Sequence, residues 1–401
     1  MQIDIKQTEV EERGSMEGTV REKQNSSAEP LVTRHVFLDT QVYRQVRHNP
    51  ANPALVKLQE QIEAHRVVLH TTDITVLEVK RQIYEAVVEH QRTLKKIERD
   101  DFRRWREQAP RACPGSLEFD AEALSTELFV TLMVFLREWC RVKEHSGLKV
   151  DPGTIFAQYF ERKPPFVEGK EKEFPDAFVV EALRRWARDH NTQLYVVTKD
   201  DGIIRAADAD PHLLPLKDIS EVLTRATAGL QSQAGPIAED LVSHPVFDRT
   251  LEQLLKARMK EATYVYTGDL PDGEAYEGDL LEVEVDSWSV VGLYAERISL
   301  LLDLTVEVRV EVVFTEDDGA FYDREDGRWI GDMTTVWTYV ESNVPVKVLA
   351  EVSRTSGEVV EAQLLRSEIV ISGHPSYCDD YKSFPAESRP SLVRERAEPP
   401  W

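Results

Sequence analysis

The chain has 401 residues, a formal net charge of −23 and a hydrophobic content of 41%. This length favours two domains, and the apolar content excludes wholesale disorder. The excess of acid argues against adhesion to nucleic acid or membranes over the whole surface, and three cysteines without CxxC spacing exclude a disulfide framework and the common zinc modules. Because the chain has neither an apolar leader nor a membrane-length apolar run, we expect a soluble, cytoplasmic protein without a membrane partner.

Strands and helices alternate in the first half. Residues 1–30 are polar and predict a flexible arm, and the run HVFLD at 35–39 reads as a buried strand that ends at a carboxylate. A helix at 53–65, a strand at 66–72 and a long helix at about 74–107, capped by Thr72 or Asp73, follow. Further segments are a helix at 119–145, a helix that opens at Phe174-Pro-Asp176, a strand at 193–198, a short helix at 203–209 and a strand at 213–216. This order predicts an α/β domain at 31–222, with a parallel sheet flanked by helices.

The pattern changes after residue 220. A helical linker is expected at 223–260, with a break near Ala234-Gly-Pro236. Apolar and polar residues then alternate at every position of 302–312. Similar alternation recurs at 280–291, 333–340, 344–352 and 359–371. Such alternation is typical of half-buried antiparallel strands. We therefore expect a mostly antiparallel, β-rich domain at 261–382 and a loose tail at 383–401.

Four acids stand at the ends of predicted strands or near the starts of helices: Asp39, Glu78, Asp176 and Asp200. The carboxyl ends of parallel strands share one edge of a sheet, so these acids are expected to meet there. Crowded carboxylates repel one another unless a cation neutralises them, and their oxygens suit Mg²⁺ or Mn²⁺. Such ions support phosphodiester hydrolysis by a metal-activated water. Helix capping explains any one of these acids alone better than metal binding does, and only their joint order favours a metal site.

The residues that carry this order resemble a PIN domain, a nuclease fold, over positions 35–220. The matching pieces are VFLDT, TTDITVLEVKRQI, FPDAFVVEAL and YVVTKDDGI. The resemblance implies that Asp39, Glu78, Asp176 and Asp200 are the catalytic and metal-binding acids, and that Thr198 positions Asp200 or a metal-bound water. Asp201 could replace or assist Asp200 as a metal ligand, or could be a simple helix cap. The long insertion between Glu78 and Asp176 and the β-rich domain depart from compact toxin members and are closer to a larger bacterial PIN-like group.

A basic stretch begins directly after Glu78. Its candidate nucleic-acid-binding residues are Lys80, Arg81, Lys95, Lys96, Arg99 and Arg103. A basic helix that leads away from a metal site fits a phosphate backbone. Lysine and arginine are also good helix formers that pair with acids at helical spacing, and this explanation is slightly favoured.

No other catalytic motif competes, since the chain lacks a glycine-rich phosphate loop, GxSxG and HExxH. We therefore predict a Mg²⁺- or Mn²⁺-dependent endoribonuclease that cuts single-stranded RNA. A toxin, defence or RNA-decay role is implied by the resemblance alone. The alternative is a PIN-like scaffold that binds RNA or a partner protein without cutting. The β-rich domain carries no motif, and binding to nucleic acid, to a partner protein or to a second copy of the chain is open to it. The high acid content of residues 268–286 and 316–326 argues against direct contact with nucleic acid there.

Overall fold

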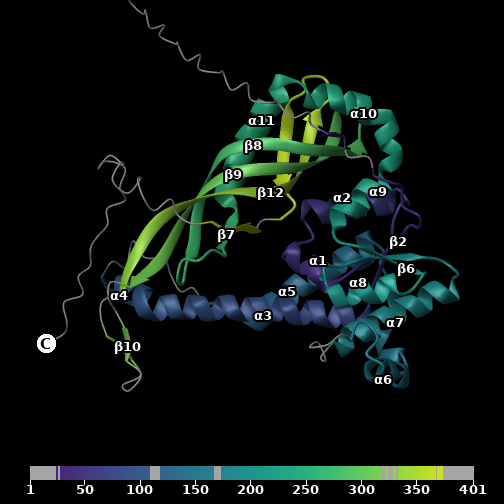
Figure 1. Ribbon diagram of the computed structural model, residues 1–401, viewed down its shortest axis with the longest axis horizontal. Coiled ribbons are helices and arrows are strands. Elements are labelled where there is room, and N and C mark those ends of the chain that lie inside the picture. The colour runs from purple at the N-terminus through teal and green to yellow at the C-terminus, as the bar shows by residue number, and fades with distance from the viewer. Residues whose placement is uncertain are drawn as a thin grey trace, which may run out of the picture.

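The computed structural model (Figure 1) describes residues 24–25, 28–108, 118–166, 173–317, 321–323, 328–330, 333–366 and 368–373. The predicted arm at 1–30 lies mostly outside these residues, and the predicted tail at 383–401 lies entirely outside them. Within the described residues, no helix combines the length and the apolar character needed to cross a membrane.

A five-stranded parallel sheet forms the centre of the first half, in the order β4-β3-β2-β5-β6. Its strands are β2 (His35–Leu38), β3 (Val68–Thr72), β4 (Lys143–His145), β5 (Leu194–Val197) and β6 (Leu213–Leu216). From β2 the chain continues to β3 on one side, and it later returns to β5 on the other side. The boundary between β2 and β5 is therefore the topological switch point, where open α/β sheets bind their ligands.

Helices cover both faces of this sheet. The helices of the first half are α1 (Thr40–Gln45), α2 (Pro53–Glu63), α3 (Asp73–Ile97), α4 (Arg103–Gln108), α5 (Ala121–Val134), α6 (Pro152–Phe160), α7 (Phe174–Asp189), α8 (Asp201–Asp208) and α9 (Ile219–Ala226). Of these, α4 lies at the far end of α3 and α6 contacts α7. Short helical turns occupy η1 (Glu98–Phe102), η2 (Phe135–Trp139) and η3 (Gly147–Lys149). Phe37 packs with α7 and α8, whereas Val36 and Leu38 pack with α1, α2, α3, α5 and α9. The strand therefore buries both of its faces, as a central parallel strand does.

A second, mostly antiparallel sheet is built mainly from the second half of the chain, in the order β1-β8-β9-β12-β13. Its strands are β1 (Gln24–Asn25), β8 (Glu274–Leu293), β9 (Arg297–Asp317), β12 (Met333–Ser353) and β13 (Val359–Leu364). One face packs against α10 (Ala228–Val242) and α11 (Pro245–Glu261), through alternate residues such as Leu300, Leu302 and Leu304. Smaller pairs are β7 (Thr263–Tyr266) with β14 (Glu368–Ile371), and β10 (Phe321–Asp323) with β11 (Arg328–Ile330). The predicted fold class is confirmed in both halves.

The opposite face of the second sheet packs against the first half. Leu301 and Leu349 join the apolar cluster that contains residues of α2 and α9. Lys57 of α2 is buried at this contact, with its Nζ 3.0 Å from Glu351 Oε1 and 3.1 Å from Ser299 Oγ. Figure 1 shows the long strands β8, β9 and β12 running from the end near α2 and α9 toward the end of the view where α4 is labelled. The two halves are therefore packed together along one end of the long strands.

The predicted helix break at Ala234-Gly-Pro236 is wrong, because α10 continues through Pro236. Proline in a helix interior costs one backbone hydrogen bond, and here burial of Ala234 and Ala238 against the second sheet offsets that cost. The interruptions fall instead at Thr227 and at Ser243-His244.

Two strand predictions also differ from the structure. The helix predicted to reach residue 145 ends at Trp139, and the polar segment Lys143–His145 is an edge strand. The two runs predicted at 333–340 and 344–352 are a single strand, β12, which passes through Pro345. The pairing of β12 with β13 begins only at Val348, so β12 is an edge strand at Pro345, where proline is tolerated.

Candidate active site

Asp39 and Thr198 lie next to each other at the switch point of the parallel sheet. Asp39 follows β2, and its backbone N–H donates to the carbonyl of Val197, the last residue of β5, at 3.1 Å. The Thr198 hydroxyl donates to Asp39 Oδ2 at 2.7 Å and accepts the backbone N–H of Asp200 at 3.0 Å. One hydroxyl therefore fixes the first predicted acid and the start of the loop that carries another.

The Asp39 carboxyl is buried and held at both oxygens. Oδ1 accepts the backbone N–H of Thr40 at 2.6 Å, at the start of α1, while Thr198 holds Oδ2. Burial raises the pKa of Asp39, and the hydrogen bonds from Thr198 and Thr40 oppose that shift. The orientation of this carboxyl is therefore set by the protein itself, as a preorganised site requires.

Asp200 caps α8 and shares a confined space with a second acid. Its Oδ1 accepts the backbone N–H groups of Gly202 at 2.7 Å and Ile203 at 3.1 Å. A Cβ on Gly202 would lie 2.8 Å from Glu173 Oε2 and 2.9 Å from Asp200 Oδ1. The two carboxyl groups therefore border the same small space beside Gly202. Asp200 therefore has two roles: it caps a helix, as is expected for acids at helix starts, and it belongs to the acid cluster.

Glu78 and Asp176 lie at the same edge of the sheet but on two different helices, α3 and α7. Glu78 lies near the start of α3, and Asp176 lies in the first turn of α7, which contacts α3. Burial, followed by the charges of four neighbouring acids, raises the pKa of Asp176 to about 7; these acids are Asp39, Glu78, Asp200 and Glu173. Burial and the charge of Asp39 also raise the pKa of Glu78, against the effect of Arg81. The structure therefore brings all four predicted acids into one electrostatic cluster.

Glu173 is a fifth acid that sequence reasoning missed. It is the residue before α7, and its charge is among those that raise the pKa of Asp176. The available signal was its spacing, because residues three positions apart lie near each other on a helix surface. The motif FPDAF drew attention to Asp176 alone.

Asp201 lies outside the acid cluster. Its side chain is exposed in the first turn of α8, and it is not among the charges that shift the pKa of the clustered acids. Within the described residues, the structure therefore provides no contact that makes Asp201 a substitute for Asp200.

The basic stretch lies mainly on α3, on the β3 side of the acid cluster. Its exposed members are Lys80, Arg81, Lys95, Lys96 and Arg99. Lys80 Nζ lies 5.7 Å from the centre of the Phe129 ring, and Arg81 is 3.6 Å from Glu85. Lys95 lies about 25 Å along the helix from Glu78. The Arg103 side chain is outside the described residues.

Residues 36–203 match a family model described as a PIN domain. The chain therefore contains a PIN domain. The matched segment runs from β2 into α8 and includes all five clustered acids, and the predicted resemblance is confirmed. Searches of curated proteins and of solved structures gave no match.

The donors in the PIN domain suit a hard divalent cation. They are carboxylate oxygens supported by a threonine hydroxyl, which is the ligand chemistry that Mg²⁺ and Mn²⁺ prefer. In the part of the chain that the structure describes, no three His, Cys, Asp or Glu side chains form a ready-made ligand group. Burial first, and then the charges of the neighbouring acids, raise the pKa of Asp176 to about 7, and a bound cation would favour the charged form of these carboxyl groups. The residues therefore fit an ion that would draw them together.

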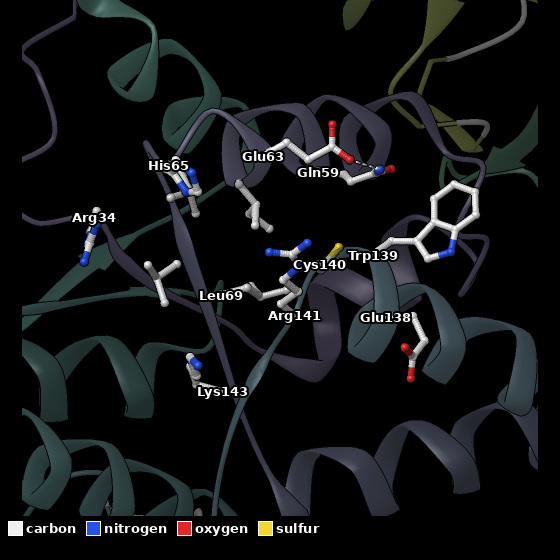
Figure 2. Close-up of a pocket in the computed structure, with 13 residues that line it drawn as sticks. Arg34, Gln59, Glu63, His65, Leu69, Glu138, Trp139, Cys140, Arg141 and Lys143 are labelled. Atoms are coloured by element: carbon white, nitrogen blue, oxygen red, sulfur yellow. Dashed lines mark hydrogen bonds between the residues drawn. The ribbon is translucent and has the colours of Figure 1, made fainter.

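A cavity lies elsewhere in the PIN domain. It has a volume of about 780 Å³ and borders the amino-terminal ends of the strands, near Arg34 and Val68. Figure 2 shows Arg34, His65, Arg141 and Lys143 around it. Its lining includes none of the five clustered acids, which lie at the opposite edge of the sheet. The acid cluster is therefore separate from this cavity.

Proposed function

We propose that the chain is a divalent-metal-dependent endonuclease that hydrolyses phosphodiester bonds, with single-stranded RNA as the favoured substrate. The observation that carries the proposal is the convergence of five acids at the switch point of a PIN domain, where their mutual repulsion helps to raise the pKa of Asp176 to about 7. The preference for RNA, and a role in defence, toxin action or RNA decay, rest on the family resemblance.

Each residue has a distinct part in this proposal. Asp39, Glu78, Asp176 and Asp200 would hold Mg²⁺ or Mn²⁺. When bound, such an ion supplies positive charge to the scissile phosphate and lowers the pKa of an attacking water. Thr198 orients the Asp39 carboxyl and fixes the loop of Asp200. The exposed cations of α3 favour approach of the substrate backbone from the β3 side of the site.

The test is cleavage of a labelled, unstructured RNA by the purified full chain, with DNA of the same sequence in parallel. We expect cleavage with Mn²⁺ or Mg²⁺, loss of cleavage with EDTA and recovery after excess ion is added. Asp39→Asn and Asp176→Asn should lower the rate by ~100-fold or more, because each removes an anionic ligand. Circular dichroism and thermal unfolding verify that the variants fold.

The neighbours Asp200 and Asp201 give a matched pair of variants. Asparagine remains a good helix cap, so Asp200→Asn should keep α8 while it loses cleavage. Asp201→Asn changes an exposed acid outside the cluster and should cleave at the wild-type rate. Cleavage by a folded Asp39→Asn protein, or cleavage that EDTA does not affect, contradicts the proposal. RNA binding by the wild type without any cleavage favours the scaffold alternative.

A further inference from the structure

The second half of the chain brings a lysine to the edge of the PIN domain. In β12, Glu351 contacts Lys57 and Leu349 packs into the PIN core, so alternate residues face the PIN domain. Lys347 is the next residue in this row and forms an ion pair with Asp303 on β9 at 2.6 Å. The Lys347 side chain is 38% exposed, whereas that of Glu351 is 9% exposed. Lys347 therefore lies where the sheet leaves the PIN surface.

Arg366 lies beside Lys347 and is held against the PIN domain. The backbone N–H of Leu365 donates to the carbonyl of Lys347 at 3.0 Å, and Leu365 packs into the PIN core. Asn52 Nδ2 donates to the Leu365 carbonyl at 3.2 Å. The Arg366 guanidinium forms an ion pair with Asp218, which follows β6 and caps α9. Arg366 is therefore fixed near the carboxyl end of β6.

Lys199 supplies a third cation from the loop that carries Asp200. The backbone N–H of Thr198 donates to the carbonyl of Leu216 at 2.9 Å, so Lys199 runs beside the segment that leads to Asp218. Lys199 is exposed and forms no salt bridge within the described residues. Asp218 in turn pairs with Arg366, and Arg366 follows Leu365, whose backbone N–H donates to the carbonyl of Lys347. The three cations therefore share one region.

We propose that Lys199, Lys347 and Arg366 form a phosphate-binding surface that holds the backbone of single-stranded RNA beside the PIN acids. This inference rests on the proposed function and makes the β-rich domain part of the substrate site. Asp303 pairs with Lys347 and Asp218 pairs with Arg366, whereas Lys199 forms no salt bridge within the described residues. The Lys347 and Asp303 side chains are 38% and 39% exposed, and solvent-exposed ion pairs contribute little to stability, so Lys347 can turn to a phosphate at little cost.

The position of this surface defines a path for a single strand of RNA. The acids lie at the β2–β5 boundary, the cations of α3 lie on the β3 side, and the new surface lies on the β6 side. In a chain with a net charge of −23, most of the surface repels a polyanion. Two basic regions on opposite sides of the acids therefore direct the backbone across them.

The test measures RNA binding separately from cleavage. A fluorescein-labelled, unstructured RNA is titrated with the full chain in EDTA at several salt concentrations. Each of Lys199→Gln, Lys347→Gln and Arg366→Gln should weaken binding several-fold. The triple variant should reduce the slope of log K against log salt by about 2, since each phosphate contact contributes about 0.7 for single strands.

Arg309→Gln is the matched control. Arg309 pairs with Glu341 across the same two strands, β9 and β12, and the two side chains are 44% and 43% exposed. Glu341 lies six positions, about 20 Å, along β12 from Lys347. The control should bind RNA as the wild type does. Arg366→Lys keeps the charge beside Asp218 and should recover most of the binding, which separates loss of charge from local misfolding.

The outcomes separate this inference from the proposed function. A triple variant that binds with the wild-type affinity and salt slope overturns the inference, as does a wild type that binds no RNA. A wild type that cleaves RNA, with a KM that the triple variant leaves unchanged, overturns the inference alone. Binding that depends on the three cations without any cleavage supports this surface and contradicts the proposed function.

Discussion

The Thr198 hydroxyl donates a 2.7 Å hydrogen bond to Asp39 Oδ2 and thereby joins the residues that follow β5 and β2. The same oxygen accepts the backbone N–H of Asp200 at 3.0 Å. Thr198 is wholly buried, so water does not replace either bond. The relative placement of Asp39 and Asp200 therefore depends on one uncharged side chain.

Replacing Thr198 with valine tests this dependence, because valine keeps the shape and removes the hydroxyl. Asp39 Oδ2 then lacks its donor in a buried place, and we expect the free energy of unfolding to fall by about 1–3 kcal/mol. Loss of a group that orients a ligand should also weaken Mn²⁺ binding and cleavage by roughly 10–100-fold. Urea denaturation and Mn²⁺ titration measure the two effects. Thr198→Ser keeps the hydroxyl and is the control; a valine variant with wild-type affinity for Mn²⁺ would contradict the prediction.

Asp176→Asn should stabilise the metal-free protein at high pH. The folded pKa of Asp176 is about 7, above its ordinary value of 3.8, so between these values the folded state holds a proton that the unfolded state releases. Stability contributed by this group therefore falls as the pH rises through that window. At pH 8 in EDTA, we expect the variant to be about 1–3 kcal/mol more stable than the wild type.

In saturating Mn²⁺, the stability advantage of Asp176→Asn over the wild type should shrink. The reason is that the wild type gains stability from an ion that the variant binds less well. Urea unfolding at pH 5 and pH 8, with EDTA or Mn²⁺, provides the measurement. Asp201→Asn is the control, since its carboxyl is exposed and outside the cluster. A variant that is no more stable than the wild type at pH 8 in EDTA would count against crowding of the acids.

Signals for the acids were local, and this explains why they were found. Asp39 directly follows the buried run Val36 to Leu38, and Asp176 directly follows a proline that opens a helix. Neither position requires knowledge of distant contacts. The strand Lys143–His145 gave no such signal, because its three residues are polar and its pairing with β3 depends on a neighbour more than 70 positions away.

Contacts between the two halves could not be predicted from either half alone. Lys347 and Arg366 approach Lys199 only because Leu349 and Leu365 pack into the PIN core. The alternation in β12 indicated which residues share a face, but not what that face covers. Likewise, nothing in the segment around Lys57 indicates its contacts with Glu351 and Ser299.

Three histidines on neighbouring strands predict sensitivity to acid. His70 bonds to His35 at 2.9 Å and to His145 at 2.7 Å, and Trp186 lies over it with ring centres 4.3 Å apart. Burial, followed by the charges of nearby groups, lowers the pKa of His70 to about 3; these groups are His145, His35, Lys143 and His190. The unfolded state therefore takes up a proton below pH 6.5 that the folded state does not, until the pH approaches 3. Stability should fall by about 2 kcal/mol between pH 7.5 and pH 5 from this group.

The histidine effect is measured best in the Asp176→Asn background, because Asp176 shifts stability in the opposite direction over an overlapping range. In that background, His70→Gln should reduce the loss of stability between pH 7.5 and pH 5, as followed by urea unfolding. His90→Gln removes an exposed histidine and should leave the loss unchanged. An identical loss with and without His70 would show that this histidine does not control the acid response.

The last prediction concerns the ion pair that joins the two halves. Lys57 and Glu351 side chains are 6% and 9% exposed, and Arg297 is a second cation near Glu351, at 3.4 Å. Lys57→Met leaves the Glu351 carboxylate buried without its closest cation, which should cost about 3–5 kcal/mol. The double variant Lys57→Met/Glu351→Leu removes both charges, so it should be less destabilised than the sum of the single variants. A double-mutant cycle from urea unfolding measures this coupling. Strictly additive effects would mean that the pair does not stabilise the contact between the PIN domain and the second sheet.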